Sequence, residues 1–269
     1  MVRRVNSKVL TFAILGDSAA SGVGDYDLFG RTRGWCIHLA SAFRDPINIV
    51  NVARPGAQSR EVRETQLPKA IALKPDIAAI VVGGNDALRN GFNPSILYEN
   101  LQSIVGEVKA HGAEVLMLQL HDPTQIVPMP RLLKRILLRR IDSVNEVYER
   151  IAKEFELILL RTRALPNIYD LKFWHFDRMH PSTQGHLVLA KFFREALVKK
   201  GWGIEEVVIE IPQEFSRKQR FRWMLRNGLP WFIKRSFDLL PAVILLMTLE
   251  LFRLVIGRAR QESNLRQPA

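Results

Sequence analysis

Apolar runs of strand length recur along the chain, and each is followed by turn residues and then by a helical pattern. The apolar runs occupy residues 9–15, 47–53, 76–82, 113–120 and 156–160. The helical patterns occupy residues 33–43, 59–72, 93–112, 131–155 and 181–201. Because the apolar runs are continuous and do not alternate with polar positions, they predict strands that are buried on both faces. The order of elements therefore predicts an α/β protein whose parallel sheet is covered by helices on both sides.

Proline and glycine residues, and a change in composition, indicate the limits of the last helix and of the folded body. Pro181 is expected in the first turn of the last helix, and Gly201 is expected to stop it. The composition changes after Pro212, where a segment rich in Arg, Lys and Trp begins. We therefore expect a body at residues 1–212, a basic and apolar extension at 213–256 and a disordered tail at 257–269.

The charge of the chain is unevenly distributed. The formal net charge is +12, and residues 213–269 carry 11 of the 39 Lys and Arg but only 4 of the 27 Asp and Glu. Such a basic segment points to an anionic partner, a lipid surface or nucleic acid, and carries no information about fold. The single cysteine, Cys36, excludes an internal disulfide and fits a reducing compartment. The basic first residues run into the first strand without a cleavage-like stretch, so we expect a cytoplasmic protein.

Polar residues and glycines gather at the predicted carboxyl ends of the strands, where ligands bind in parallel sheets. Gly16-Asp17-Ser18 follows the first strand, Gly56 follows the second, and Gly83-Gly84-Asn85-Asp86 follows the third. Asp177-Arg178-Met179-His180 precedes the last helix. A serine, a backbone N–H at a glycine, a side-chain amide and an Asp/His pair are the groups that serine acyl transfer needs.

Four blocks in order make the sequence similar to a known family, the SGNH (GDSL-type) hydrolases. The blocks are GDSAASG, Gly56, GGND and DRMH, and the resemblance spans roughly residues 9–200. It implies a three-layer α/β/α flavodoxin-like sandwich with a five-stranded parallel sheet. The chain departs from the commonest pattern at Ala19, where leucine is usual, and at Ala57; neither position supplies a reacting group.

The resemblance also implies a role for each motif residue. Ser18 is expected to be the nucleophile, His180 its base, and Asp177 the carboxylate that orients the imidazole. The N–H groups of Ser18 and Gly56 and the side-chain amide of Asn85 are expected to form the oxyanion hole. The implied activity is hydrolysis of esters of small or medium acyl size without metal or cofactor. An acyltransferase or a thioesterase with the same site, and a catalytically silent membrane-associated binding protein, are the alternatives.

Taken singly, most of these residues have structural interpretations as well. Ser18 could cap a helix, Gly56 could serve a turn after Pro55, and Asn85 could form a cap or an Asx-turn. His175, Asp177 and His180 could be read as a metal cluster, but no further ligand group accompanies them. The pair His121-Asp122 follows the fourth strand. Two interpretations are open for it: hydrogen bonding within the loop, or a second acid/base pair.

Two basic segments leave a choice of partner. The first is the run Arg131, Lys134, Arg135, Arg139 and Arg140, which is either a solvated helix face or a contact for an anionic substrate or surface. The second is residues 215–256, whose apolar run of eleven residues at 239–249 is short of the ~20 needed to span a bilayer. It is expected either to lie along an anionic membrane surface, on the inner face of the membrane, or to pack on the body. We expect no nucleic-acid partner, and the oligomeric state stays open.

Overall fold

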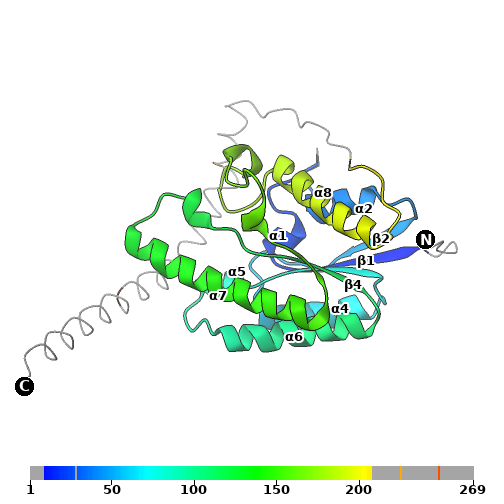
Figure 1. Cartoon of the computed structure of the whole chain (residues 1–269), viewed down its shortest axis with the longest axis horizontal. Coiled ribbons are helices and arrows are strands. Elements are labelled where there is room, and N and C mark those ends of the chain that lie inside the picture. The colour runs from blue at the N-terminus through cyan, green and yellow to red at the C-terminus, as the bar shows by residue number, and fades with distance from the viewer. Residues whose placement is uncertain (1–8, 28, 208–224, 226–247, 249–269) are drawn as a thin grey trace, which may run out of the picture.

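A five-stranded sheet forms the centre of the protein, for which we describe a computed structural model (Figure 1). Its strands are β1 (Leu10–Gly16), β2 (Ile47–Asn51), β3 (Ile77–Val81), β4 (Glu114–Leu118) and β5 (Ile158–Leu160). All neighbours pair in parallel, in the order β2-β1-β3-β4-β5. Every residue of β3 is buried, as expected for a strand covered on both faces. This confirms the predicted parallel sheet and its five strands.

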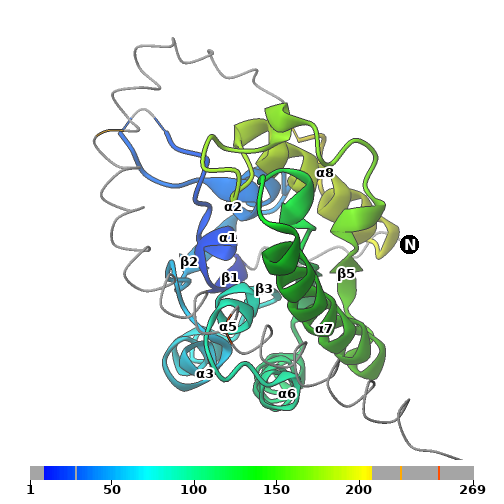
Figure 2. The same cartoon turned by 90° about the vertical axis from the view of Figure 1, so that its left-hand side faces the viewer.

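Helices cover both faces of the sheet, which confirms the three-layer sandwich (Figures 1 and 2). The helices are α1 (Ser18–Ser21), α2 (Gly34–Ser41), α3 (Ser59–Glu61), α4 (Leu67–Ile71), α5 (Gly84–Leu88), α6 (Pro94–Ala110), α7 (Arg131–Phe155) and α8 (Thr183–Lys199). Shorter 3-10 turns occupy Pro123–Gln125, Thr162–Ala164 and Leu171–Phe173. Helices α2 and α8 lie against one face, and α4, α6 and α7 lie against the other.

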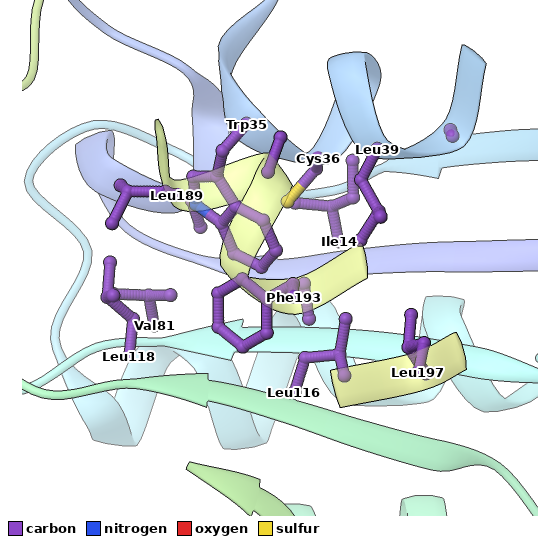
Figure 3. Packing of buried hydrophobic residues seen from close by; sticks show 14 of the residues in the cluster. Ile14, Trp35, Cys36, Leu39, Val81, Leu116, Leu118, Leu189, Phe193 and Leu197 are labelled. Carbon is purple, nitrogen blue, oxygen red and sulfur yellow. The ribbon is translucent and has the colours of Figure 1, made fainter. Parts of the chain in front are cut away.

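Each face of the sheet buries its own apolar core. On the α2/α8 side, the rings of Trp35 and Phe193 stack with their centroids 4.4 Å apart over residues of β1 and β4 (Figure 3). On the α6/α7 side, Tyr148 of α7 is fully buried and its hydroxyl bonds to the backbone of Val82, just beyond β3. Shifting a strand by one residue would exchange its two sides and place the side chains of one core in the other. Because each face packs against its own core, the register of the strands is fixed.

Two helices differ from their predicted form. The segment predicted as one helix at 59–72 contains a π-helical turn, Val62–Gln66, in which Leu67 N–H donates to the carbonyl five residues back, at Val62. Pro68 follows directly and has no N–H to continue the regular ladder. The last helix begins at Thr183, not at Pro181, because the Ser182 side chain caps it by accepting from Gly185 N–H at 3.2 Å.

The structure describes residues 9–27, 29–207, 225 and 248. Apart from positions 225 and 248, the extension expected at 213–256 and the tail expected at 257–269 lie outside these residues, so their boundaries and the membrane contact stay predictions. Within the described part of the chain, none of the helices has the length and apolar character needed to cross a membrane.

Candidate active site

Ser18 is the first residue of α1. The turn that leads into this helix needs a glycine at position 16. Gly16 ends β1 with φ +132°, and a Cβ built there would lie 1.9 Å from the Val81 carbonyl oxygen. The next residue, Asp17, caps α1 by accepting from Ala19 N–H at 3.0 Å. The close approach of β1 to β3 and the immediate helix start therefore hold Ser18 at the carboxyl edge of the sheet.

The turn before Ser18 has a second support, which the sequence interpretation missed. The buried Gln66 side chain accepts from Gly16 N–H at 2.7 Å and donates to the Gly16 carbonyl at 3.0 Å. Gln66 belongs to the π-helical turn, so the irregularity in that helix coincides with the residue that ties it to the end of β1. The pair of hydrogen bonds fixes both backbone groups of Gly16, two residues before Ser18.

Asp177, His180 and Ser18 form one chain of hydrogen bonds. The His180 Nε2 atom lies 2.8 Å from Ser18 Oγ, and its Nδ1 atom lies 2.8 Å from Asp177 Oδ2. The other oxygen of Asp177 accepts from the backbone N–H groups of Met179 and His180, at 2.9 and 3.0 Å. Arg178 turns the chain with φ 55°. With a carboxylate accepting at Nδ1–H, Nε2 is left to accept the proton of the Ser18 hydroxyl.

The Asp177 carboxylate is shared with a second histidine. Burial raises the pKa of Asp177, but hydrogen bonds from His175 and His180 outweigh it and hold the pKa well below its usual range. The Nδ1 atom of His175 lies 3.2 Å from Asp177 Oδ2, the same oxygen that faces His180. Asp177 is therefore an anion wherever the protein is folded near neutral pH. The sequence interpretation considered His175 only as a metal ligand.

The three expected oxyanion donors come from three consecutive loops at the same edge. Ser18 follows β1, Gly56 follows β2 with φ 86°, and Asn85 lies in the first turn of α5 after β3. The Asn85 amide nitrogen lies 3.2 Å from Asp17 Oδ2 and 3.2 Å from the Ala57 carbonyl. These contacts link the three loops directly. They are also long, so an oxyanion beside Ser18 would compete for the same amide hydrogens.

The aspartate of the GGND block serves the scaffold. Asp86 accepts from the backbone N–H of Ser59 at 3.0 and 3.1 Å and from its hydroxyl at 2.6 Å. Asn100 of α6 donates to the same hydroxyl at 3.0 Å. This network joins α3, α5 and α6 at the residue that follows Asn85. Burial raises the pKa of Asp86, and the hydrogen bonds from Ser59 offset part of that rise.

The His121-Asp122 pair does not form a second acid/base couple. The ring of His121 packs against Trp174 with centroids 4.0 Å apart, and among the described residues its buried Nε2 has no hydrogen-bond partner. This corrects the expected loop hydrogen bonding of His121. Asp122 does bond within its loop, to Thr124 N–H and the Gln125 amide. Burial lowers the pKa of His121 to about 3, so its imidazole is neutral.

Two of the alternative sites suggested by the sequence, the metal cluster and the basic run at 131–140, fall on residues that the structure describes. In the described part of the chain, no group of three or more His, Cys, Asp or Glu side chains is arranged to hold a metal ion. His175 and His180 both turn Nδ1 toward Asp177. The basic run of α7 is divided: Arg140 donates to the carbonyls of Ala87 and Arg89, each at 2.8 Å. The other four line an open hollow of about 640 Å³ with Asp142 and Glu146: Arg131, Lys134, Arg135 and Arg139.

Asp17 gives the stability of this site a pH dependence. Burial raises the pKa of Asp17 from 3.8 to about 6, although Ala19 N–H and the Asn85 amide hydrogen-bond to the carboxylate. Between pH 4 and 6 the unfolded chain therefore loses this proton while the folded protein keeps it. Folding stability falls over that window, by about 3 kcal/mol for this group alone.

The variant Asp17→Asn isolates the effect, because it keeps every other titrating group. Denaturant unfolding at a series of pH values is expected to show wild-type stability falling relative to the variant from pH 4 to pH 7. The two proteins then differ in the slope of unfolding free energy against pH, whatever their absolute stabilities are. Parallel curves for the two proteins would show that Asp17 titrates normally.

A serine, a histidine and an aspartate joined by hydrogen bonds at the carboxyl edge of a parallel sheet are the groups that α/β hydrolases use for acyl transfer. The model of the GDSL-like Lipase/Acylhydrolase family matches residues 14–188. The chain belongs to this family. It is accordingly an enzyme of the esterase, thioesterase and acylhydrolase group, which confirms the resemblance inferred from the four sequence blocks.

Known proteins agree with this assignment at moderate similarity. The chain is 27% identical over 189 residues to "Thioesterase 1/protease 1/lysophospholipase L1" of Escherichia coli (strain K12), covering 70% of this chain and 83% of that protein. It is 29% identical over 154 residues to "Esterase TesA" of Pseudomonas aeruginosa, covering 56% and 69%. The structure of a lipase/acylhydrolase from Enterococcus faecalis superposes with a TM-score of 0.56 at 16% identity, covering 75% of this chain and 100% of that one. The last likeness supports the fold alone.

Proposed function

We propose that the protein hydrolyses carboxylic esters of apolar, small or medium acyl groups through an acyl-enzyme on Ser18. The observation that carries this proposal is the hydrogen-bonded chain from Asp177 through His180 to Ser18, with both links at 2.8 Å. A nucleophile, a base within reach of its proton, and a carboxylate orienting that base are the groups that activate a serine. All three lie at the edge of the sheet where ligands of parallel sheets bind.

The proposed reaction uses these groups twice. Ser18 Oγ attacks the ester carbonyl while His180 Nε2 takes the hydroxyl proton, and Asp177 stabilises the imidazolium through Nδ1–H. The N–H groups of Ser18 and Gly56 and the Asn85 amide bind the oxyanion. His180 then gives its proton to the departing alcohol, leaving an acyl-serine. Water repeats the sequence with His180 as base, releasing the acid and restoring Ser18.

The surroundings of the catalytic loop favour an apolar acyl group. Phe176 and Met179 immediately flank the residues of the triad and leave 42% and 39% of their surfaces exposed. The two residues that follow Ser18 in the chain, Ala19 and Ala20, have small side chains. An acyl chain laid over Phe176 and Met179 removes apolar surface from water, which is worth about 0.8 kcal/mol for each buried CH₂.

A panel of esters that share one leaving group and differ in acyl length tests the substrate class. We expect butyryl and octanoyl esters to react faster than acetyl esters, and the double variant Phe176→Ser/Met179→Ser to flatten this preference mainly through KM. Val198→Ser is the matched control, because Val198 is 40% exposed but lies at the far end of α8. A flat acyl profile in the wild type would contradict an apolar acyl site.

The leaving group is a separate question, and the relatives differ on it. The Escherichia coli relative carries the names of a thioesterase and a lysophospholipase, and a relative from Geobacillus stearothermophilus is named an acetylxylan esterase. Including a thioester of each acyl chain in the same panel distinguishes the two chemistries. Faster turnover of the thioester than of the matched oxoester would favour the thioesterase alternative with the same acyl-enzyme.

A further inference from the structure

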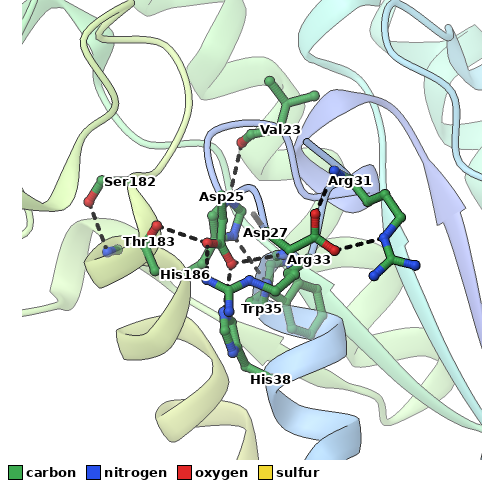
Figure 4. A network of polar contacts seen from close by, with 12 residues as sticks. Val23, Asp25, Asp27, Arg31, Arg33, Trp35, His38, Ser182, Thr183 and His186 are labelled. Carbon is green, nitrogen blue, oxygen red and sulfur yellow. Dashed lines mark hydrogen bonds and ion pairs between the residues drawn. The ribbon is translucent and has the colours of Figure 1, made fainter. Parts of the chain in front are cut away.

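Outside the hydrogen-bonded chain of Asp177, His180 and Ser18, a further carboxylate, that of Asp25, is fully buried and takes no part in the proposed reaction. It is 0% exposed and accepts hydrogen bonds from four groups (Figure 4). These groups are Arg33 Nη2 at 3.0 Å, Thr183 Oγ1 at 2.8 Å, Gly34 N–H at 3.2 Å and His38 Nε2 at 2.6 Å. Burial raises the pKa of Asp25, but the bonds from His38 and Thr183 outweigh it and hold the pKa well below its usual range. Because four hydrogen bonds hold this buried carboxylate, its position relative to its partners is fixed.

The partners of Asp25 belong to two segments that are far apart in the sequence. Asp25 lies in the loop that follows α1, and α1 starts with Ser18. Thr183 is the first residue of α8, three positions after His180. The bond between Asp25 and Thr183 therefore spans 158 residues and joins the segment carrying the nucleophile to the segment carrying the base.

Further contacts join α8 and the residues just before it to the chain that follows α1, as far as the start of α2. His186, one turn into α8, accepts from Trp35 N–H at Nδ1 over 3.2 Å and donates from Nε2 to the Val23 carbonyl over 3.1 Å. Burial lowers the pKa of His186 to about 4, so this imidazole stays neutral with one tautomer. Gly24 brings the backbones together, since a Cβ there would lie 2.1 Å from the Pro181 carbonyl oxygen.

We propose that Asp25, Thr183 and His186 form a clamp that sets the distance between Ser18 Oγ and His180 Nε2. The inference rests on the proposed function of Ser18 and His180. The two catalytic side chains lie 162 residues apart, and the direct bond between them cannot itself align the loops that carry them. The clamp aligns these loops because it ties the chain that follows Ser18 to the chain that follows His180. Its members are positioning residues, because none of them contacts a reacting atom.

The smallest test removes one hydroxyl. Thr183→Val keeps the shape of the side chain and deletes its bond to Asp25, whereas Thr183→Ser keeps the bond. Because a 1 Å misplacement can lower a rate by about 10²-fold, we expect Thr183→Val to lower kcat by about 10-fold with little change in KM. Thr183→Ser is expected to keep the wild-type rate, and Thr183→Val is expected to add little when Asp25 is already asparagine.

Asp27→Asn is the matched control for Asp25→Asn. Asp27 lies in the same loop and accepts from Phe29 N–H and from the backbone and side chain of Arg31, at 2.7 to 2.9 Å. Figure 4 shows both carboxylates, and only Asp25 reaches across to α8. Asp25→Asn is expected to lower kcat at least as much as Thr183→Val, while Asp27→Asn leaves it unchanged.

Labelling with a fluorophosphonate separates positioning from folding. The stoichiometry of labelling gives the fraction of protein molecules with a competent site. The rate of labelling gives the reactivity of Ser18. The clamp predicts full stoichiometry with a slower rate in Thr183→Val. A lower stoichiometry at an unchanged rate, or equal rates in the valine, serine and wild-type proteins, would overturn it. If the wild type itself takes no label, the proposed function fails instead, so the two failures are distinguishable.

Discussion

Replacing Ser18 with alanine is expected to abolish ester hydrolysis, lowering kcat by about 10⁶-fold. The Ser18 hydroxyl lies 2.8 Å from His180 Nε2, at the end of the hydrogen-bonded chain from Asp177. Alanine removes the oxygen on which we propose that the acyl-enzyme forms, and it leaves His180 and Asp177 in place. The oxyanion donors and the binding surface then provide only the residual rate that they give to attack by water.

Active-site titration beside steady-state kinetics checks this expectation. Ser18→Ala should take up no fluorophosphonate, retain only about 10⁻⁶ of the wild-type kcat, and unfold at the wild-type temperature. Ser21→Ala is the matched control: Ser21 lies in the same short helix, and its hydroxyl donates to the Ser18 carbonyl at 3.1 Å. An Ser18→Ala protein that still turned over esters at the wild-type rate would remove Ser18 from the mechanism.

The sheet and its helices could be predicted because their signal is local and repeated. Continuous apolar runs are what strands buried on both faces require, and α7 occupies the whole of its predicted range, 131–155. The start of the last helix was predicted two residues early. The choice between Pro181 and Thr183 as the first helical residue depends on the cap formed by the Ser182 side chain, which composition does not reveal. The π-helical turn before Pro68 is absent from the prediction, because an apolar period does not distinguish a bond to the fourth preceding residue from one to the fifth.

The residues of the candidate site could be named from motifs, but not their supports. Ser18, Gly56, Asn85, Asp177 and His180 each stand at a strand end or before the last helix, where topology alone brings them to one edge. Gln66 and Asp25 act through hydrogen bonds to residues 50 and 158 positions away. A buried polar side chain whose hydrogen-bond partner lies so far along the chain leaves no periodic pattern in the sequence. Its only local trace is a polar residue at a position that could equally be exposed.

Asp177→Asn is expected to lower kcat by about 10⁴-fold, less than Ser18→Ala but far more than a lost surface contact. The reason is the second oxygen of Asp177, which accepts from the N–H groups of Met179 and His180. An asparagine in this place must turn its oxygen toward those two donors. Its NH₂ group then faces His180 Nδ1, where Asp177 Oδ2 now accepts at 2.8 Å.

That orientation holds the imidazole in the wrong tautomer. With Nδ1 accepting from the amide, the proton of neutral His180 sits on Nε2, which can no longer accept the proton of Ser18. Nitrogen chemical shifts of His180 should show the exchange of protonated atoms, and the fluorophosphonate should label Ser18 slowly but completely. Asp170→Asn, in an exposed ion pair with Lys172 at 3.3 Å, is the control and should keep the wild-type rate. If Asp177→Asn keeps the wild-type tautomer and loses rate all the same, Asp177 acts through its charge on the imidazolium and not by selecting the proton position.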